Sequence, residues 1–219
     1  MNELRYTLLS DGSSDKALIP ILTWLLREHH VECAIQPRWA DLRRLPKPKL
    51  PKTLSSRIIS SLDLYPCDLL FIHRDAEKQP RSFRVAEIQE AMEKAGESLF
   101  VPIVCVVPVR MQEAWLLFDE AALRRASGNP RGRQPLQLPD LARVEQMPDP
   151  KNELYSLLQT ASGLTGRRLK DFPVRERAQR VAELIDDFTS LRVLSAFSEL
   201  EAELEQVIQM QGWCSYESQ

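Results

Sequence analysis

Acidic side chains follow two apolar stretches of the sequence, at the points where these stretches end. Asp11 follows the first stretch, with Asp15 four residues further on, and Asp75 follows the second, with Glu77 two residues further on. Clustered carboxylates repel one another unless a positive charge lies between them. A hard cation such as Mg²⁺ is commonly held by a few carboxylates and water. The pattern therefore indicates a divalent-metal site, although each acid alone is equally typical of a turn or a helix cap.

Short buried strands that alternate with amphipathic helices would position these acids. We predict strands at residues 6–9, 31–36, 68–73 and 99–109, and helices at residues 18–26, 54–62 and 83–95. Strands separated by helices favour βαβ units, and hence an α/β fold with a parallel sheet. In a doubly wound sheet with the order 2-1-3-4, the carboxyl ends of strands 1 and 3 open into one crevice. We expect Asp11, Asp75 and Glu77 to meet there, and extended backbone would point Asp75 and Glu77 the same way.

The second half of the chain is mostly helical. Residues 112–126 are predicted to form a helix, residues 127–140 a loop rich in glycine and proline, and most residues after 150 further helices. Apolar residues at a spacing of three to four predict a last helix that packs on the core: Leu194, Phe197, Leu200, Leu204 and Ile208. We therefore divide the chain into an α/β domain, residues 1–126, and a helical C-terminal region, residues 127–219, packed against it.

Three segments resemble parts of a known family. Residues 8–15 (LLSDGSSD) resemble the opening of a Toprim domain: a strand, an acid, glycine, two residues and another acid. Residues 69–77 (LLFIHRDAE) resemble the Toprim strand that ends in Asp-x-Asp. Residues 111–119 (MQEAWLLFD) are similar to a segment of a Toprim-like family related to the OLD nucleases and associated with mobile elements and phage defence. The resemblance covers about the first 120 residues and implies a Toprim-like, doubly wound, mainly parallel sheet with a helical C-terminal extension.

This resemblance implies a nuclease that uses Mg²⁺ or Mn²⁺ to break phosphodiester bonds of nucleic acid, DNA in the first place, with phage defence as its context. Toprim domains usually have Glu where this chain has Asp11 and Asp where it has Glu77. Both replacements keep an oxygen ligand but change its reach, so a degenerate binding or adaptor module that works through a partner such as an ATPase is the alternative. The implied catalytic residues are Asp11, Asp75 and Glu77, and the implied metal ligands are Asp11, Asp15, Asp75, Glu77 and Glu113.

Basic residues gather after the second predicted strand, in a proline-rich segment that we expect to be an extended loop. The chain as a whole has 29 Lys and Arg against 31 Asp and Glu, and hence a net charge of −2. A basic loop can neutralise phosphates and release their counterions, so we predict nucleic-acid binding here, with plain solvated surface as the alternative. The predicted binding residues are Arg38, Arg43, Arg44, Lys47, Lys49 and Lys52.

Length and composition are those of a soluble globular protein. The 219 residues are 43% hydrophobic, and no stretch approaches the roughly 18 apolar residues of a membrane helix. The start of the sequence has no basic segment leading into an apolar one, as a signal peptide would. The four cysteines are scattered, which favours free thiols in a reducing compartment. We therefore expect a cytoplasmic protein without a membrane partner. Sequence motifs of P-loop, dinucleotide-binding and HExxH enzymes are absent.

Overall fold

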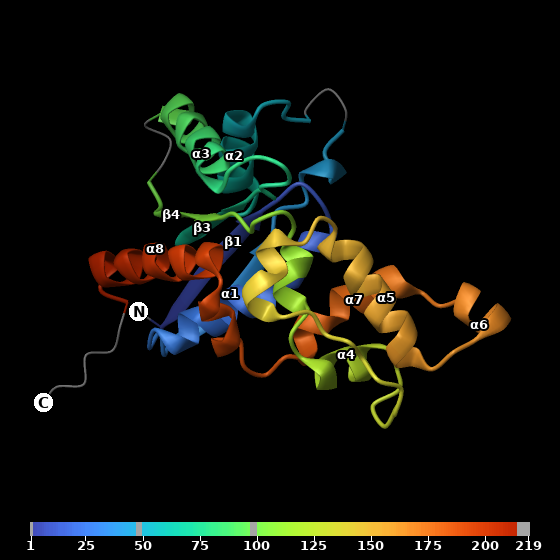
Figure 1. Cartoon of the computed structure of the whole chain (residues 1–219). Coiled ribbons are helices and arrows are strands. Elements are labelled where there is room, and N and C mark those ends of the chain that lie inside the picture. The colour runs from blue at the N-terminus through green and yellow to red at the C-terminus, as the bar shows by residue number, and fades with distance from the viewer. Residues whose placement is uncertain (1, 47–49, 97–99, 214–219) are drawn as a thin grey trace, which may run out of the picture.

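A four-stranded parallel sheet forms the centre of the N-terminal half (Figure 1). The computed structural model describes residues 2–46, 50–96 and 100–213. The strands are β1 (Glu3–Leu9), β2 (Ala34–Trp39), β3 (Leu69–His73) and β4 (Ile103–Val106), in the order β2-β1-β3-β4. Leu9 lies opposite Ile72, so β1 and β3 end close together. The α/β class and the predicted strand order are thereby confirmed, and both are consistent with a Toprim-like doubly wound fold.

Both faces of the sheet are buried, because apolar residues occupy consecutive positions and successive side chains point to opposite faces. In β3, Leu69 and Phe71 belong to one core, whereas Leu70 and Ile72 belong to a second core on the other face. All four side chains are fully buried. The two cores fix the sheet between layers of helices, and they fix the direction in which the chain leaves each strand end.

Helices cover the two faces (Figure 1). On one face lies α1 (Leu18–Glu28), preceded by the 3₁₀ helix η1 (Ser14–Ala17). On the other lie α2 (Leu54–Leu64) and α3 (Arg81–Ala95). Thr53 begins α2 with a capping box, in which its hydroxyl accepts from the main-chain N–H of Ser56. No helix in the described ranges is both long enough and apolar enough to cross a bilayer.

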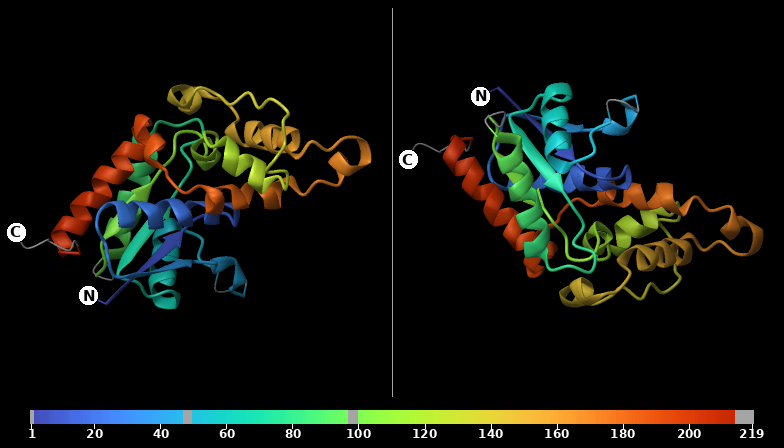
Figure 2. Two further views of the ribbon diagram at one scale, coloured as in Figure 1. Left: turned by 90° about the horizontal axis from the view of Figure 1, so that it is seen from below. Right: turned by 90° about the horizontal axis from the view of Figure 1, so that it is seen from above.

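The second half of the chain folds into helices, most of which contribute buried residues to the first core (Figure 2). These are α4 (Glu120–Ala126), α5 (Pro150–Ser162), α6 (Gly166–Lys170), α7 (Val174–Val181) and α8 (Ser195–Gln211). The predicted apolar stripe of the last helix is fully or almost fully buried, which confirms that α8 packs on the core. At the centre of this contact, the rings of Trp115 and Phe197 meet edge to face, with centroids 5.4 Å apart.

Several predicted elements have different bounds in the structure, beginning with β1, which starts at Glu3 instead of residue 6. The second strand starts at Ala34, because Arg27 donates to the carbonyl oxygens of Val31 and Cys33 and holds the preceding residues in a turn. The fourth strand is only Ile103–Val106, because Pro102 and Pro108 bracket it and lack the N–H that a ladder needs.

The segment predicted as one helix over residues 112–126 is divided in two. It begins with the 3₁₀ helix η5 (Gln112–Leu116), and α4 follows after a short break. Asp119 lies in the break and accepts a hydrogen bond from the main-chain N–H of Ala122 at 2.9 Å. A side-chain acceptor of this kind starts a new helix. At the start of η5, the main-chain N–H of Gln112 lies at the strand ends and donates to Asp75 Oδ1 at 3.0 Å.

On both edge strands, β4 and β2, the row of outward main-chain N–H groups is incomplete. On β4, the outward main-chain N–H of Cys105 donates to Glu203 of α8 at 3.0 Å. On the other edge, the main-chain N–H groups of Ala34 and Ala40, at the two ends of β2, face β1. They donate to the carbonyl oxygens of Asn2 and Leu8, at 3.2 and 3.0 Å. Because alternate residues of a parallel strand face alternate neighbours, Pro37 lies in the row that faces away from β1. Proline contributes no donor to that row.

Candidate functional site

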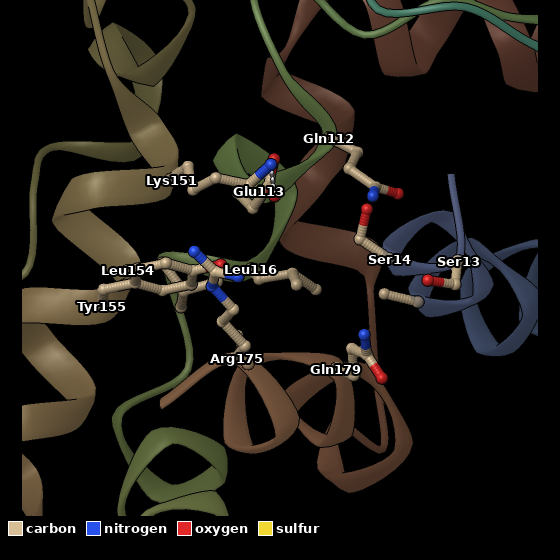
Figure 3. A pocket seen from close by; sticks show the side chains of 12 residues that line it. Ser13, Ser14, Gln112, Glu113, Leu116, Lys151, Leu154, Tyr155, Arg175 and Gln179 are labelled. Atoms are coloured by element: carbon tan, nitrogen blue, oxygen red, sulfur yellow. Dashed lines mark ion pairs between the residues drawn. The ribbon is translucent and has the colours of Figure 1, made fainter. Parts of the chain in front are cut away.

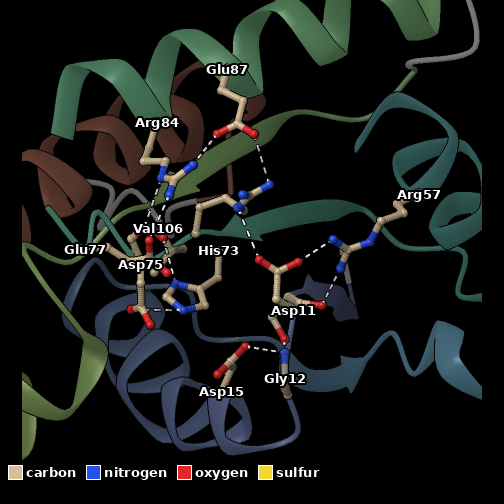
Figure 4. Close-up of polar contacts among 12 residues, drawn as sticks. Asp11, Gly12, Asp15, Arg57, His73, Asp75, Glu77, Arg84, Glu87 and Val106 are labelled. Carbon is tan, nitrogen blue, oxygen red and sulfur yellow. Dashed lines mark hydrogen bonds and ion pairs between the residues drawn. The ribbon is translucent and has the colours of Figure 1, made fainter. Parts of the chain in front are cut away.

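A cavity of about 270 Å³ opens at the carboxyl ends of β1 and β3 (Figure 4). We call it the acid cavity. Four of the five predicted metal ligands line it, from two segments that are far apart in the sequence. Its lining residues are Asp11, Gly12, Asp15, His73, Arg74, Asp75, Glu77 and Arg84. The parallel pairing of β1 with β3 is what brings the segments together, as the strand order predicts.

Asp75 is the most perturbed acid of the cavity. Burial raises its pKa to about 6, and the nearby charges of Glu113 and Asp15 add to this effect. His73 and the main-chain N–H of Gln112, which donates to Asp75 Oδ1 at 3.0 Å, act in the opposite direction. A carboxyl with this pKa exchanges its proton close to neutral pH, which is a common property of acids at functional sites.

His73 is 2% exposed and is held in one orientation. Its Nδ1 donates to the carbonyl oxygen of Val106 at 2.9 Å, because a carbonyl can only accept. Nε2 then faces Asp75 Oδ1 at 3.5 Å. His73 is therefore a buried histidine that is anchored to the main chain of β4 and whose second ring nitrogen lies beside the Asp75 carboxyl group.

Asp15 is buried and is joined to Asp75 through a single residue. It accepts hydrogen bonds from the main-chain N–H of Gly12 at 2.8 Å and from the Ser14 hydroxyl at 3.0 Å. The side-chain amide of Gln112 donates to it at 2.9 Å. Because the main chain of Gln112 holds Asp75, Gln112 ties the two carboxylates together.

Arginines neutralise Asp11 on the other side of the cavity. Asp11 contacts Arg57 on α2 and lies 3.2 Å from Arg74 Nε (Figure 4). Arg74 also contacts Glu87 at 3.2 Å. The carboxylate of Asp11 is therefore shared between two guanidinium groups from different segments.

Glu77 lines the same cavity but is more exposed and differently oriented than expected. The strand ends at His73, so the extended backbone that would point Glu77 the same way as Asp75 is not present. Glu77 has a φ of +56° and a side chain that is 64% exposed. It pairs with Arg84 at 3.4 Å, and Arg84 also donates to the main-chain oxygen of Asp75 at 3.1 Å.

Glu113 lies close to Asp75 but faces a neighbouring cavity. Its Oε1 pairs with Lys151 of α5 at 2.9 Å, and its carboxylate is not part of the acid-cavity lining. The structure thus brings Asp11, Asp15, Asp75 and Glu77 to one cavity and places Glu113 behind it.

The donor set of the acid cavity has the chemistry of a hard-cation site. All of its acidic ligand atoms are carboxylate oxygens, which Mg²⁺ prefers. Among the described residues, Asp15 and Asp75 make no ion pair with an arginine, whereas Asp11 and Glu77 do. Within residues 2–46, 50–96 and 100–213, no group of three or more His, Cys, Asp or Glu side chains is arranged around one point to hold a metal ion. A third carboxylate ligand from this cavity would have to come from Asp11 or Glu77, and both of these pair with arginine.

No protein-family model, curated protein or solved structure matches this chain.

The sequence patterns did not reveal the residues that surround the acids. Arg74 lies directly between His73 and Asp75, and its position at a strand end was a usable signal. Arg57 and Arg84 reach the cavity from α2 and α3, and no local motif marks them. Gln112 opens the segment that suggested Glu113, but only its two hydrogen bonds in the structure show that it bridges two acids.

The predicted basic segment is partly described. Lys47 and Lys49 lie outside the described residues, and Arg38 is exposed on β2. Arg43 and Arg44 both pair with Asp41, at 3.1 and 3.0 Å. A further cavity of about 260 Å³ lies between this segment and the acid cavity; we call it the basic cavity. Its charged lining residues are Asp11, Asp41, Arg43, Lys52 and Arg57.

Proposed function

We propose that this protein is a metal-dependent nuclease that cleaves phosphodiester bonds of nucleic acid, with DNA as the first substrate to test. The observation that carries the proposal is the acid cavity, in which carboxylates from the ends of two neighbouring parallel strands lie among arginines. Carboxylates suit a divalent cation and guanidinium groups suit a phosphate. One cavity thus offers ligands for both partners of a phosphoryl-transfer site.

Asp15 and Asp75 would hold the cation, joined by Asp11 or Glu77 after release from arginine. A divalent cation supplies charge stabilisation for the attacking and leaving oxygens of an in-line displacement. Arg57 and Arg74 would exchange the carboxylate of Asp11 for the substrate phosphate. Their ion pairs with Asp11 keep these guanidinium groups at the rim before the substrate arrives. The main-chain N–H of Gln112 would position Asp75, beside which His73 lies.

Cleavage of supercoiled plasmid and of single-stranded oligonucleotides, in Mg²⁺, in Mn²⁺ and in EDTA, tests the proposal directly. We expect cutting in either metal, none in EDTA and none by Asp11→Ala. Asp63→Ala is the matched control, because Asp63 is an exposed acid of α2 away from the cavity. No cutting by the wild type in any metal, or cutting that persists in EDTA, contradicts a metal-dependent nuclease.

The basic cavity is expected to contribute to substrate binding through charge. Replacing both Arg43 and Lys52 with Gln should weaken DNA binding and lower the salt dependence of log K by up to about 0.9 for each phosphate that is no longer neutralised. Fluorescence anisotropy of a labelled oligonucleotide, measured in EDTA over a range of salt concentrations, gives both quantities.

The matched control for this pair replaces Arg131 and Arg133, which are exposed in the loop after α4. Their loss removes the same net charge from a different surface. If the two double variants weaken binding equally, the basic cavity is ordinary solvated surface and only the total charge of the protein matters.

A non-catalytic binding module that works through a partner protein, such as an ATPase, is the second candidate. The observation that favours it is the pairing of Asp11 and Glu77 with arginines, which satisfies both carboxylates without a cation. This candidate predicts DNA binding that is unchanged by Mg²⁺ and no cutting. The same plasmid assay, run beside the anisotropy titration, distinguishes the two.

A further inference from the structure

A cavity of about 330 Å³ lies behind the acid cavity, where η1 and η5 meet α5 and α7 (Figure 3). We call it the helical cavity. Its volume lies within the range of small-ligand pockets. Its polar lining includes Gln112, Glu113, Lys151, Tyr155, Arg175 and Gln179. Gln112 belongs to the wall between the two cavities, because it also holds Asp15 and Asp75.

Two residues that line this cavity each carry a buried acceptor atom without a hydrogen-bond donor in the described part of the chain. Gln112 Oε1 and Glu113 Oε2 are unpaired, in residues that are only 3% and 5% exposed. The other polar atoms of the same side chains are used, by Asp15 and by Lys151. Buried acceptors are almost always paired in folded proteins, so two consecutive unpaired ones indicate a place for donors from a ligand.

The remaining walls show what kind of ligand would bring those donors. Leu116, Leu154 and Ala178 provide apolar surface, and Tyr155 lies beside them. Arg175 is exposed, extends to the cavity from α7 and makes no ion pair within the described ranges (Figure 3). The cavity therefore combines buried acceptors, apolar walls suited to a flat ring and a free cation that solvent can reach.

We propose that the helical cavity binds a nucleotide whose base carries an exocyclic amino group. The amino group of adenine, cytosine or guanine would donate to Gln112 Oε1 and Glu113 Oε2, while the phosphate would face Arg175. Uracil and thymine have no amino group and offer only one N–H donor, between two carbonyl oxygens, so they cannot satisfy both acceptors without placing a carbonyl oxygen against one of them. The cavity should therefore discriminate by base.

This inference rests on the proposed nuclease function and specifies its substrate. Because Gln112 separates the helical cavity from Asp15 and Asp75, the bound base would belong to a nucleotide beside the cleaved phosphate. A base enters a pocket only when it has left the stack. The protein is thus expected to act on single-stranded nucleic acid, or on a nucleotide extruded from a duplex.

Isothermal titration calorimetry in EDTA with AMP, CMP, GMP and UMP, and with the corresponding nucleosides, tests the site without involving cleavage. We expect at least one nucleotide with an amino-bearing base to bind about tenfold or more tightly than UMP. Glu113→Gln should reduce this preference. Arg175→Ala should weaken binding of monophosphates about fivefold or more but leave nucleosides unchanged.

Two exposed residues of α7 provide matched controls. Arg180→Ala and Glu176→Gln remove the same charges from positions that do not line the cavity, and both should bind like the wild type. Melting temperatures establish that each variant is folded, and Arg175→Ala keeps the test valid if Glu113→Gln does not fold. Equal binding of UMP, no binding of any nucleotide at millimolar concentration, or no effect of Arg175→Ala would each overturn the inference.

Failure of the inference and failure of the nuclease proposal give different results. Base-selective binding in EDTA without any cutting in Mg²⁺ or Mn²⁺ would support the nucleotide site and contradict the nuclease proposal. Metal-dependent cutting without base-selective binding would do the opposite.

Discussion

Replacing Asp75 with asparagine is expected to abolish cleavage while making the metal-free protein more stable at pH 8. Even groups that only orient a metal ligand are worth ten- to a hundredfold in activity, so loss of a ligand should reduce cutting by about a hundredfold or more. The gain in stability has a separate cause. Burial makes the ionised carboxylate unfavourable, and asparagine keeps the shape of the side chain without its charge.

The pH dependence follows from the direction of the pKa change. The pKa of Asp75 is about 6 in the folded protein and 3.8 as its ordinary value, so the folded state binds the proton more tightly. This contribution to stability is fully present below pH 4 and is lost as the pH rises to about 6. The difference between the two pKa values corresponds to about 3 kcal/mol. The variant should therefore match the wild type at pH 4 and exceed it by up to about 3 kcal/mol at pH 8.

Urea unfolding in EDTA across this pH range measures the effect, with Asp63→Asn as the control on the exposed surface of α2. If the Asp75 variant is instead less stable than the wild type at pH 8, the ionised carboxylate is a structural acceptor for Gln112. Asp75 would then have a structural role, and the proposal that it is a metal ligand would be contradicted.

Replacing Phe197 with alanine is expected to destabilise the protein by about 3–5 kcal/mol, the usual loss for a buried Phe. Phe197 is fully buried and meets Trp115 edge to face. This contact joins α8 to η5 and hence the C-terminal region to the α/β half. Because the first core contains residues of both halves, the whole chain should still unfold in a single transition.

Phe100→Ala is the matched control, because Phe100 is 90% exposed and its loss should change stability by no more than about 0.5 kcal/mol. Thermal and urea unfolding followed by circular dichroism give both values. A separate early transition in the Phe197 variant, with little change in the main one, would mean that the C-terminal helices are only loosely attached.

Most of the fold could be predicted because strands and helices have different apolar periods. Uninterrupted apolar residues marked β3 as buried on both faces, and the spacing from Leu194 to Ile208 marked the buried face of α8. The ends of the elements were harder to predict, because individual polar contacts determine where each element starts and stops. Arg27 delays the start of β2, and Asp119 divides the predicted helix after Gln112. Such contacts leave no periodic signal.

The candidate site was predictable only as far as the strand ends define it. Asp11 and Asp75 were found because parallel strands bring their carboxyl ends to one edge. The positive charge of the cavity was not predicted. Arg57 and Arg84 come from α2 and α3, and no pattern in the sequence places these helices beside the acids. The opposite happened with Glu113. The sequence predicted it as a metal ligand, but in the structure its carboxylate pairs with Lys151.

The edges of the sheet limit how this protein can assemble. Exposed edge strands invite pairing with another chain, through aggregation or strand exchange. Here Glu203 occupies the outward N–H of Cys105 on one edge, and Pro37 removes a donor from the middle of the other. A fifth strand from a second molecule would find an incomplete ladder on both sides. Self-association or partner binding by this protein should therefore use helix surfaces and loops, and leave the sheet as a closed unit.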